Sequence, residues 1–563
     1  MMKKRILLRK FIPFLLAVLF AASSGILPAV ALTVGQNVGI GKVTQVTTKT
    51  IGDDLTFETA IIHENNGMDQ SLYTFSFNPQ TSDCIPLAYS KQNGYGAPVY
   101  DTAVQAEENG YDVKAAFNAA FFVMSKPHTS SNTYGGVNIS DGRIMQGDNR
   151  FGTTWELIFF SDGRADLVQS RVTYSATVKG KSLPLSHINI CPTTAQETDS
   201  EIYYYDSFCG TKTDTKAPGV EVVFEKQDGT ELTVGGTLVG KVVEIRKNVS
   251  TGGTIEENQF VLYASDASYS DTLRSLAIGD TVKINAAETV AASKTAMETC
   301  SSAIVTYGYH IVMNGKNVTN QDRLGDEFNT ARAQRTALGI KADGSLLIVA
   351  SDGRKPDTFP GMTVYELADY MIAQGCVTVV NLDGGGSTQV TVEDESGNLK
   401  SVFNTESRPV ANCLLLVARP NIDAETKDKL RSLIVYGKRL ESDGSYTGSK
   451  SDLSAALQYA ETVADSKTSM PGDYTKAIMR LRETMEIADP PKGEGSLGDI
   501  DGNGLVEAYD YVLLKWHILG FLKLPEDWLV FADIDRNGQV EAFDYMLLKR
   551  HILGSYRIED LNT

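Results

Sequence analysis

Hydrophobic residues before position 420 follow mainly the patterns of β-strands. Segments 56–63 and 71–77 alternate in part between apolar and polar residues, and a turn at 65–67 separates them. Mainly apolar runs, typical of strands, occupy 113–117, 219–224, 260–264 and 346–350. This part of the chain is therefore predicted to be rich in strands, with a short helix at 103–109.

One stretch of this region runs from strand to helix and back to strand. A buried strand ends at Asp352 and Arg354, and Thr363 then begins a capping box that starts a helix. A β-branched run at 377–380 follows and ends at Asp383. If the two strands are parallel neighbours, Asp352, Arg354 and Asp383 lie close together, because crossover units bind ligands at the carboxyl ends of their strands.

Three glycines and two hydroxyl residues follow the second strand. Glycine allows positive φ and a close approach of the backbone to a ligand, and consecutive amides in such a turn can form a nest for an anion. The residues are Gly384, Gly385, Gly386, Ser387 and Thr388. By itself, the segment is equally compatible with a tight turn that needs glycine for its geometry.

After residue 420 the hydrophobic spacing becomes helical. Segments 451–465 and 473–487 have apolar residues on one helical face, which predicts a small helical hairpin or bundle. The proline and glycine content of 489–496 indicates a linker.

Length and charge narrow the class of protein. A chain of 563 residues allows about three or four domains. The net charge of −18 argues against nucleic-acid binding, which needs a basic surface. An anionic substrate would therefore need a locally positive pocket, for which the sequence offers Arg332, Arg335, Arg354 and Arg408.

Residues 1–31 have the pattern of a secretion signal. Basic residues at 3–10 precede an apolar core at 11–20, and Ala29 and Ala31 fit a small-residue cleavage site. A single anchoring helix is the alternative interpretation. No other stretch approaches the ~20 apolar residues of a membrane span. We therefore expect an exported chain with no membrane segment after cleavage.

The six cysteines are few for an exported chain of this length. Cys376 and Cys413 stand at the edges of apolar strands and are expected to be ordinary buried thiols. Cys191 and Cys209 could bridge a loop. No pair has the spacing of a zinc site.

The C-terminal region contains an internal repeat with an offset of 34 residues, from Gly498 and from Ala532. Each copy fits the 12-residue calcium loop, with oxygen donors at positions 1, 3 and 5, a backbone carbonyl at position 7 and an acid at position 12. The first loop supplies Asp499, Asp501, Asn503, Leu505 and Asp510. The second supplies Asp533, Asp535, Asn537, Gln539 and Asp544. The loops therefore predict two Ca²⁺ ions.

These loops differ from an EF-hand, because they end in Asp and because no helix is predicted to enter either loop. Residues 498–556 instead resemble a type I dockerin. The resemblance implies attachment to a cohesin module of a scaffoldin, in a cellulosome-like complex. The positions that match the family's partner contacts are Ala508, Tyr509, Lys515, Trp516, Ala542, Phe543, Lys549 and Arg550.

A second resemblance covers about residues 100–418. Motifs at 116–122, 335–339, 343–354, 381–388 and 408–412 occur in the order of the phosphodiester glycosidase family, and the chain is similar to that family. The Gly135–Gly136 pair fits its next hairpin. The stretch before the hairpin at 313–316 departs from the family by carrying His310, which puts the shape of the sugar pocket in question.

The resemblance implies a set of site residues. Asp383 and Asp352 are the candidate acid, base or nucleophile, and Arg335 and Arg354 the candidate phosphate clamp. Candidate substrate contacts are Asn118, Thr336, Asn381, Gly384, Gly385, Gly386, Ser387, Thr388 and Arg408. For the aspartates and for Asn118, capping of a turn is the alternative role.

The predicted organisation is a signal at 1–31, a mixed α/β or α+β catalytic region at 32–419, a helical spacer at 420–489, a linker at 490–497 and an all-α dockerin at 498–556. Segment 168–300 is expected to be a strand-rich, partial insertion. The expected activity is hydrolysis of sugar-1-phosphodiesters by a secreted, scaffold-attached enzyme. Alternatives are a glycosidase of plant-wall polysaccharide and a non-catalytic carbohydrate-binding component.

Overall fold

The computed structural model describes most of the chain. The described residues are 31–52, 55–91, 96–123, 135–148, 152–190, 201–213, 215, 217–227, 231–249, 252–306, 308–319, 325–403, 408–419, 422, 424–443, 446, 448–465, 469, 471–485, 497–500, 506, 508–518, 524, 526–553 and 557–558. Residues 1–30 of the predicted signal, residues 490–496 of the linker and Cys191 lie outside them. Among these residues, no helix has the length and apolar content needed to cross a membrane.

The first sheet has eight strands in the order β1-β2-β3-β22-β21-β23-β19-β20. Their bounds are β1 Gly41–Ile51, β2 Leu55–Glu64, β3 Asp69–Phe77, β22 Leu346–Ser351, β21 Arg335–Lys341, β23 Cys376–Asn381, β19 His310–Met313 and β20 Lys316–Asn317. Gly67 has a φ of 88° in the turn between β2 and β3, as the hairpin pattern predicts.

The predicted parallel pairing of β22 and β23 is wrong. Strand β21 lies between them and pairs antiparallel with both, Arg335 opposite Ser351 and Ala337 opposite Asn381. The two strands still run in the same direction, so their ends reach the same edge of the sheet. They end there about 10 Å apart, two strand spacings instead of one. The capping box of Thr363 and Glu366 does begin helix α5 (Val364–Ala373) between them.

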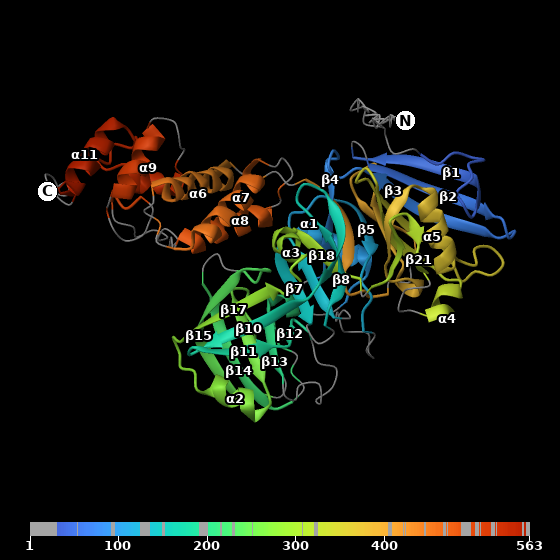
Figure 1. Cartoon of the computed structure of the whole chain (residues 1–563), viewed down its shortest axis with the longest axis horizontal. Coiled ribbons are helices and arrows are strands. Elements are labelled where there is room, and N and C mark those ends of the chain that lie inside the picture. The colour runs from blue at the N-terminus through green and yellow to red at the C-terminus, as the bar shows by residue number, and fades with distance from the viewer. Residues whose placement is uncertain are drawn as a thin grey trace, which may run out of the picture.

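A second sheet of five strands packs on the first and has the order β25-β24-β5-β26-β4. Its strands are β25 Leu399–Phe403, β24 Val390–Glu393, β5 Val113–Asn118, β26 Cys413–Ala418 and β4 Cys84–Tyr89. Phe75 of the first sheet meets Phe117 of the second edge-on, with ring centroids 5.0 Å apart. Helix α5 packs on the outer face of the first sheet, and α1 (Val99–Glu108) on that of the second. The sheet edge at which β22 and β23 end is thus part of a stack of four layers, in the order helix, sheet, sheet and helix (Figure 1).

The third sheet is the largest and is formed mainly by segment 136–305. Its thirteen strands are β11 Lys181–Leu185, β10 Val172–Val178, β17 Thr281–Glu288, β15 Thr237–Val249, β14 Gly219–Lys226, β16 Gln259–Ala264, β13 Ile202–Asp206, β12 His187–Ile188, β7 Arg143–Asp148, β6 Gly136–Ser140, β18 Ser302–Val305, β8 Thr154–Phe159 and β9 Ala165–Ser170. Short helices α2 (Ala267–Arg274), α3 (Lys294–Thr299) and η2 (Ser207–Cys209) accompany it. The predicted strand-rich character is therefore confirmed.

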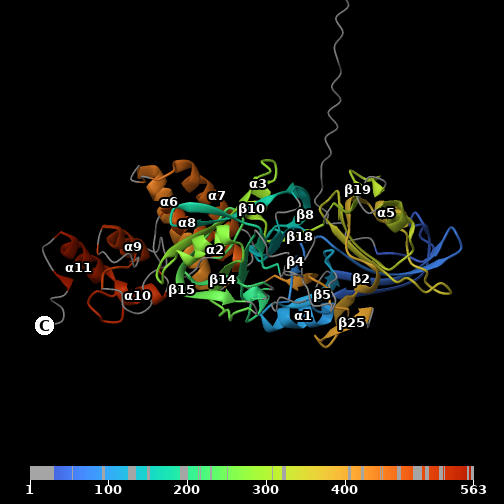
Figure 2. The same ribbon diagram turned by 90° about the horizontal axis from the view of Figure 1, so that it is seen from below.

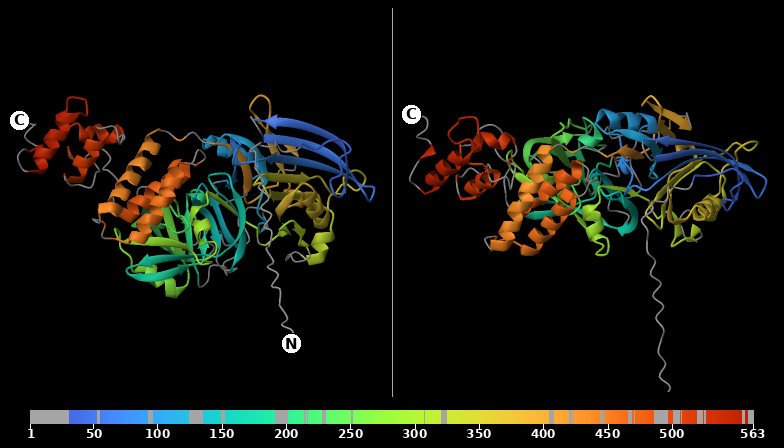
Figure 3. Two further views of the ribbon diagram at one scale, coloured as in Figure 1. Left: turned by 45° about the horizontal axis from the view of Figure 1, so that its top comes forward. Right: turned by 90° about the horizontal axis from the view of Figure 1, so that it is seen from above.

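The helical module has one helix more than the sequence pattern predicted. Besides α7 (Lys450–Asp465) and α8 (Pro471–Met485), a long helix α6 (Ala424–Asp443) completes a core shared by all three. Helix α8 contacts the turn before β15, so this module lies against the third sheet. Figures 2 and 3 show the two regions side by side in every view. The spacer is thus packed against the strand-rich region.

The C-terminal region is helical, as predicted. Its helices are α9 (Ala508–Ile518), α10 (Glu526–Ala532) and α11 (Ala542–Ile552), around a small core of their own. Helix α10 ends directly before Asp533, so the expectation that no helix enters either loop is wrong for the second loop. Residues 501–505, which include three of the five predicted ligands of the first loop, lie outside the described part of the chain.

Candidate active site and calcium loops

The glycine turn after β23 is anchored to both stacked sheets. The amide of Leu382 donates to the carbonyl of Thr336 in β21, and the amide of Asp383 donates to the carbonyl of Ala119 beyond β5, each at 2.9 Å. The amide of Gly385 then returns to the carbonyl of Gln334 at 2.9 Å. Asp383 is therefore fixed where the two sheets meet, and the short helix η4 (Gly385–Ser387) follows it.

The side chain of Asn118 joins the glycine turn to the end of β5 and to β21. Its side chain is completely buried, and its Nδ2 donates to the backbone carbonyl of Asp383 at 2.5 Å. Its Oδ1 accepts from the Thr336 hydroxyl at 2.8 Å and from the Gln389 amide at 3.3 Å. Both ends of the amide are thus used within the protein, and Asn118 holds the main chain at Asp383 in place.

Two more amide side chains continue this internal network, and the sequence analysis missed both as site residues. Gln389 accepts from the amide of Val99 at 3.1 Å and donates to the carbonyl of Arg408 at 2.8 Å. Asn412 accepts from the amide of Ala120 at 2.8 Å. Asn412 lies in a motif already matched to the family and Gln389 directly follows another, and this position in the chain was the available signal. The network brings the motifs at 116–122, 381–388 and 408–412 together.

Asp383 has the electrostatics of a reactive carboxyl group. It is partly exposed, and burial raises its pKa to about 6, although hydrogen bonds from Ser387 and the Gly384 amide and the charge of Arg408 oppose this change. The Gly384 amide donates to its Oδ1 at 2.8 Å. A carboxyl with such a pKa changes its protonation near neutral pH, which is the range in which enzymes use an acid or a base.

Two guanidinium groups lie against the glycine turn. A Cβ on Gly386 would stand 2.4 Å from Cζ of Arg408, and a Cβ on Gly385 would stand 3.0 Å from Nη2 of Arg354. Arg354 is exposed and has a φ of 58°, and Arg408 is half-buried. Glycine is needed here because any side chain would occupy the place of the two cations. The turn and its arginines therefore form a positive surface next to Asp383.

The backbone amides of the turn are directed inward. Besides Gly384 and Gly385, the amides of Ser387 and Thr388 donate to carbonyls of the turn itself, each at 3.2 Å. The predicted nest therefore has few amides left for an anion, and the positive charge at this site comes from arginine. The side chains of Thr336 and Thr388 are buried next to Asn118, and the buried Ser387 hydroxyl donates to the carboxyl group of Asp383.

Arg335 is a buried, structural cation. Its Nε donates to the carbonyl of Met362 at 3.1 Å, its Nη2 to those of Phe328 and Ala331, and its guanidinium lies 4.7 Å from the Phe328 ring centroid. Burial, and to a smaller extent the nearby charge of Arg354, lower its pKa to about 10. It supports the edge of the sheet next to the arginine pair, and Arg354 and Arg408 are the cations available to a ligand.

Asp352 is also engaged within the protein. Its Oδ2 pairs with Lys355 at 2.6 Å and its Oδ1 accepts from the amide of Gly353 at 2.7 Å. The side chain is 4% exposed. With β21 between their strands, Asp352 and Asp383 do not form a pair of facing carboxylates, and capping of the turn at Gly353, the alternative role, describes Asp352 best.

Asn381 is the last residue of β23, two residues before Asp383, and differs from Asn118. It is 1% exposed, and neither Nδ2 nor Oδ1 has a hydrogen-bond partner among the described residues. A buried amide without partners is costly. Asn381 therefore has hydrogen-bonding capacity that the described residues do not use.

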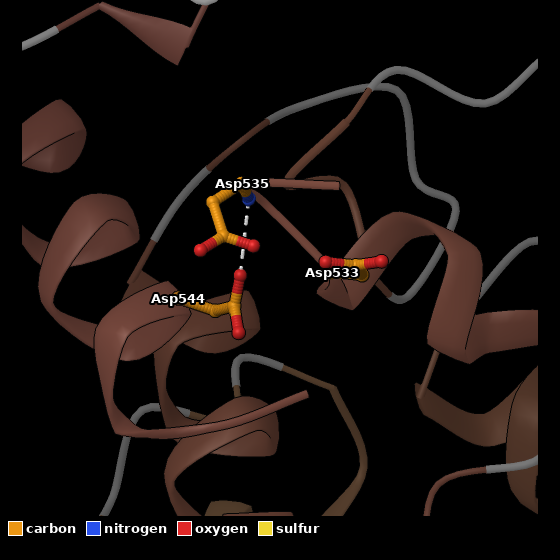
Figure 4. Close-up of side chains that lie close together, drawn as sticks. All are labelled: Asp533, Asp535 and Asp544. Carbon is orange, nitrogen blue, oxygen red and sulfur yellow. Dashed lines mark hydrogen bonds between the residues drawn. The ribbon is translucent and has the colours of Figure 1, made fainter. Parts of the chain in front are cut away.

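The second calcium loop has the donor geometry that the sequence predicts. Carboxylate oxygens of Asp533, Asp535 and Asp544 lie within 4.8 Å of one another, and Figure 4 shows the three groups turned toward a common space. Burial raises the pKa of Asp544, and the charge of Asp535 raises it further. Three acids held together in this way fit a hard cation with oxygen ligands. Asn537 is hydrogen-bonded to Asp535 at the rim.

The structure describes the first calcium loop mainly at its two ends, around Asp499 and Asp510. Asp499 and Asp510 are buried, and Oδ1 of Asp510 accepts from the amide of Ile500 at 2.7 Å. In the second loop the equivalent Asp544 accepts from the amide of Asp535 at 3.1 Å. Asp501, Asn503 and Leu505 lie outside the described residues, so their predicted role as ligands stays a prediction.

A model of the phosphodiester glycosidase family matches residues 231–417, and a model of the type I dockerin domain matches residues 497–553. The chain carries a domain of each family. The phosphodiester glycosidase match contains β21, β22, β23 and the glycine turn. It begins inside the 168–300 segment and after Asn118.

Individual proteins that resemble the chain do so over part of their length. The SPbeta prophage-derived uncharacterized protein YomE of Bacillus subtilis (strain 168) is 30% identical over 121 residues, which are 22% of this chain and 18% of that protein. The chain thus spans less than a fifth of this curated relative.

Three solved structures are similar at TM-scores below one half. A hypothetical protein from Synechocystis (TM-score 0.49, 18% identity) covers 67% of this chain and 64% of its own. The match to a putative exported protein of Burkholderia pseudomallei K96243 has a TM-score of 0.49 and 20% identity, and it covers 63% of this chain and 75% of that protein. The match to the catalytic domain of zebrafish N-acetylglucosamine-1-phosphodiester alpha-N-acetylglucosaminidase has a TM-score of 0.33 and 12% identity. It covers 66% of this chain and 87% of that domain. None of these likenesses bears on the activity.

The two halves of the dockerin repeat their contacts as well as their sequence. His517 Nδ1 accepts from the amide of Leu524 at 3.0 Å, and His551 Nδ1 accepts from the amide of Ile558 at 3.2 Å, 34 residues later. Tyr511 stacks on its equivalent Tyr545 with ring centroids 4.5 Å apart. The outward face of α11 exposes Phe543, Met546, Lys549 and Arg550. This face includes predicted partner-contact positions.

We expect the substitution Gly386→Ala in the phosphodiester glycosidase domain to lower catalytic efficiency by about 10- to 100-fold, because the new Cβ displaces the guanidinium of Arg408. The obstacle is the end of a flexible side chain, so the fold should persist. Steady-state kinetics and thermal melting check both statements. Ser396→Ala, at an exposed position of the hairpin between β24 and β25, is the control. Unchanged kinetics in Gly386→Ala would contradict the placement of Arg408.

Proposed function

We propose that the phosphodiester glycosidase domain hydrolyses the glycosidic bond of sugar-1-phosphodiesters, releasing the sugar and a phosphomonoester. The observation that carries this proposal is the position of Asp383, a carboxyl with a pKa of about 6, next to the guanidinium groups of Arg354 and Arg408 at one glycine turn. In an acidic chain with a net charge of −18, this local pair of cations is suited to a phosphodiester.

Each group has a distinct part in the proposed reaction. Arg354 and Arg408 hold the phosphate and stabilise the charge that develops on it as the bond breaks. Asp383, in its ionised form, takes a proton from the water that attacks the anomeric carbon. The bond from this carbon to the phosphate oxygen breaks, and its electron pair leaves with the phosphomonoester. Asn381 offers its free amide to a sugar hydroxyl.

One carboxylate is sufficient in this scheme. A phosphomonoester is a weakly basic leaving group and needs little protonation, whereas ordinary glycosidases use a second carboxylic acid to protonate an alcohol. The engagement of Asp352 with Lys355 supports the same division of roles. The arginine pair has no evident task in cleaving an unphosphorylated polysaccharide.

The rate of this reaction should depend on pH through Asp383. Its pKa is raised from 3.8 to about 6, and the ionised form is the active one, so kcat/KM should rise as the pH increases through about 6 and then level. A pH–rate profile of the full chain on a sugar-1-phosphodiester measures this. A profile that falls through the same range would show that the protonated form acts, and would overturn the role of Asp383 as a base.

The activity itself is tested by a release assay on a matched substrate panel. Synthetic sugar-1-phosphodiesters should be cleaved, and the same sugars linked to an alcohol without phosphate should not. The dockerin favours a second candidate, cleavage of plant-wall polysaccharide. Type I dockerins attach enzymes to cellulosome-like scaffolds, and the enzymes attached there usually degrade the plant wall. Turnover of the unphosphorylated glycosides or of wall polysaccharide alone would establish that candidate.

We further propose a secreted, scaffold-attached enzyme. Type I dockerins bind calcium, and one ion in each loop would fix the helices that meet a cohesin module. The exposed face of α11, with Phe543, Met546 and Lys549, supports this contact. A pull-down with type I cohesins of different specificity would identify the partner.

A further inference from the structure

The seam between the helical module and the third sheet contains a small cavity that the proposed function does not use. Its walls are Thr233, Val234, Gly235, Gly236 and Thr237 before and at the start of β15, and Lys476, Met479 and Arg480 of α8. The cavity volume is about 40 Å³, enough for a few waters or one small anion.

Lys476 is an unusual lining residue because its charged side chain is buried. Its side chain is only 7% exposed, and it forms neither a hydrogen bond nor an ion pair with any residue that the structure describes. Its ammonium group lies 6.0 Å from the ring centroid of Tyr459, and Cζ of Arg480 lies 5.8 Å from the same centroid. Two cations therefore approach one ring at the seam.

The surroundings do not neutralise this positive charge by direct contact. Asp473 and Glu298 act on Lys476 over a distance, but Glu298 is paired with Lys294. The neighbouring Cys300 is a neutral thiol at ordinary pH, because burial raises its pKa to about 12. Burial lowers the pKa of Lys476, as expected for a buried ammonium group without a bound counter-charge. Burying such a group unpaired is costly, and an anion would relieve that cost.

We infer that this seam binds a small oxyanion of the phosphate or sulfate class between Lys476, Arg480 and the Thr233 hydroxyl. The guanidinium fork and the ammonium group are the two donors that proteins use for such oxyanions. Because its ligands come from α8 and from the turn before β15, the bound anion would fasten the helical module to the strand-rich region. The site is separate from the arginine pair at the glycine turn.

Hydrogen–deuterium exchange of the full chain, with and without inorganic phosphate at constant ionic strength, tests this inference locally. At a phosphate concentration about nine times Kd, amides of α8 and of 231–240 that exchange through opening of the seam should slow about tenfold. Sulfate in place of phosphate asks whether the site accepts both anions. Phosphate bound at Arg354 and Arg408 would change exchange near the glycine turn instead, so the two sites are read separately.

The variant Lys476→Met keeps the length of the side chain and removes its charge, and it should lose the phosphate effect in α8. Lys450→Met, at an exposed lysine of α7, is the matched control and should keep it. Arg480→Gln provides a second test if Lys476→Met does not fold. An equal phosphate effect in wild type and the folded variant, or no effect of phosphate or sulfate on α8 in wild type, would overturn the inference.

Discussion

Replacing Asp383 by asparagine is expected to reduce kcat/KM on a sugar-1-phosphodiester by about 10²- to 10⁴-fold, the usual contribution of a general base. Asparagine has nearly the same size and can still accept the hydrogen bonds from Ser387 and the Gly384 amide. It cannot take a proton from water. Substrate binding, held by Arg354 and Arg408, should be largely retained, so the loss should appear in kcat.

The same variant should be more stable than the wild type at neutral pH. The pKa of Asp383 is raised in the folded state, so folding favours its protonated form and the stability contribution of this group falls as the pH rises through about 6. Asparagine removes that penalty and should stabilise the fold by about 1–2 kcal/mol, after allowance for partial exposure. Denaturant unfolding at pH 3, below both pKa values, and at pH 8 measures the gain, which should be nearly absent at pH 3 and full at pH 8.

This pairing of lost turnover with gained stability separates a reactive carboxyl from a structural one. Asp352→Asn is the matched control, because it breaks the pair with Lys355 and should lower stability with a smaller effect on kcat. Wild-type turnover in the Asp383→Asn protein would refute the assignment. Loss of turnover without loss of binding would rule out a purely carbohydrate-binding component.

Removal of calcium is expected to unfold the dockerin and to abolish cohesin binding, while hydrolysis by the other domain continues. Asp533, Asp535 and Asp544 hold like charges within 4.8 Å of one another, and without a cation they repel. Circular dichroism of the full chain should lose the share of helix in α9, α10 and α11 on addition of a chelator, and regain it with Ca²⁺. Cohesin affinity by calorimetry should follow the same course.

Two substitutions in the second loop make this prediction specific. Asp535→Ala removes a carboxylate ligand and should weaken calcium binding by at least about tenfold. Gln539→Ala changes a position that contributes its backbone carbonyl, so calcium binding should stay unchanged. Equal effects of the two substitutions, or a spectrum and an affinity that do not respond to chelator, would refute the calcium model.

The features that the sequence predicted well are local. The calcium loops lie within twelve residues each, so their spacing already contains their geometry. The capping box of α5 and the hairpin between β2 and β3 likewise depend on neighbours in the chain. Helix α6 was missed although Leu430, Leu433 and Ile434 have helical spacing and are buried in the core of the module.

The candidate site was predicted less completely, because its contacts join distant segments. The strand order places β21 between β22 and β23, which no local pattern reveals, and this separates Asp352 from Asp383. Arg335 fits the clamp by residue type, but its guanidinium donates to backbone carbonyls that only the fold brings to it. Asn118 and Asp383 are 265 residues apart, and their hydrogen bond depends on how the two sheets stack. Residue identity was therefore a better guide to which segments meet than to what each side chain does.

The anchoring of Asp383 to one sheet through Leu382 and to the other through its own amide has a mechanical consequence. The main chain at Asp383 cannot shift without breaking its hydrogen bond to one of the two layers. Heat inactivation should therefore coincide with cooperative melting of the catalytic region instead of preceding it, and variants that acquire new substrates should change the side chains around the turn while the path of the main chain through it stays the same.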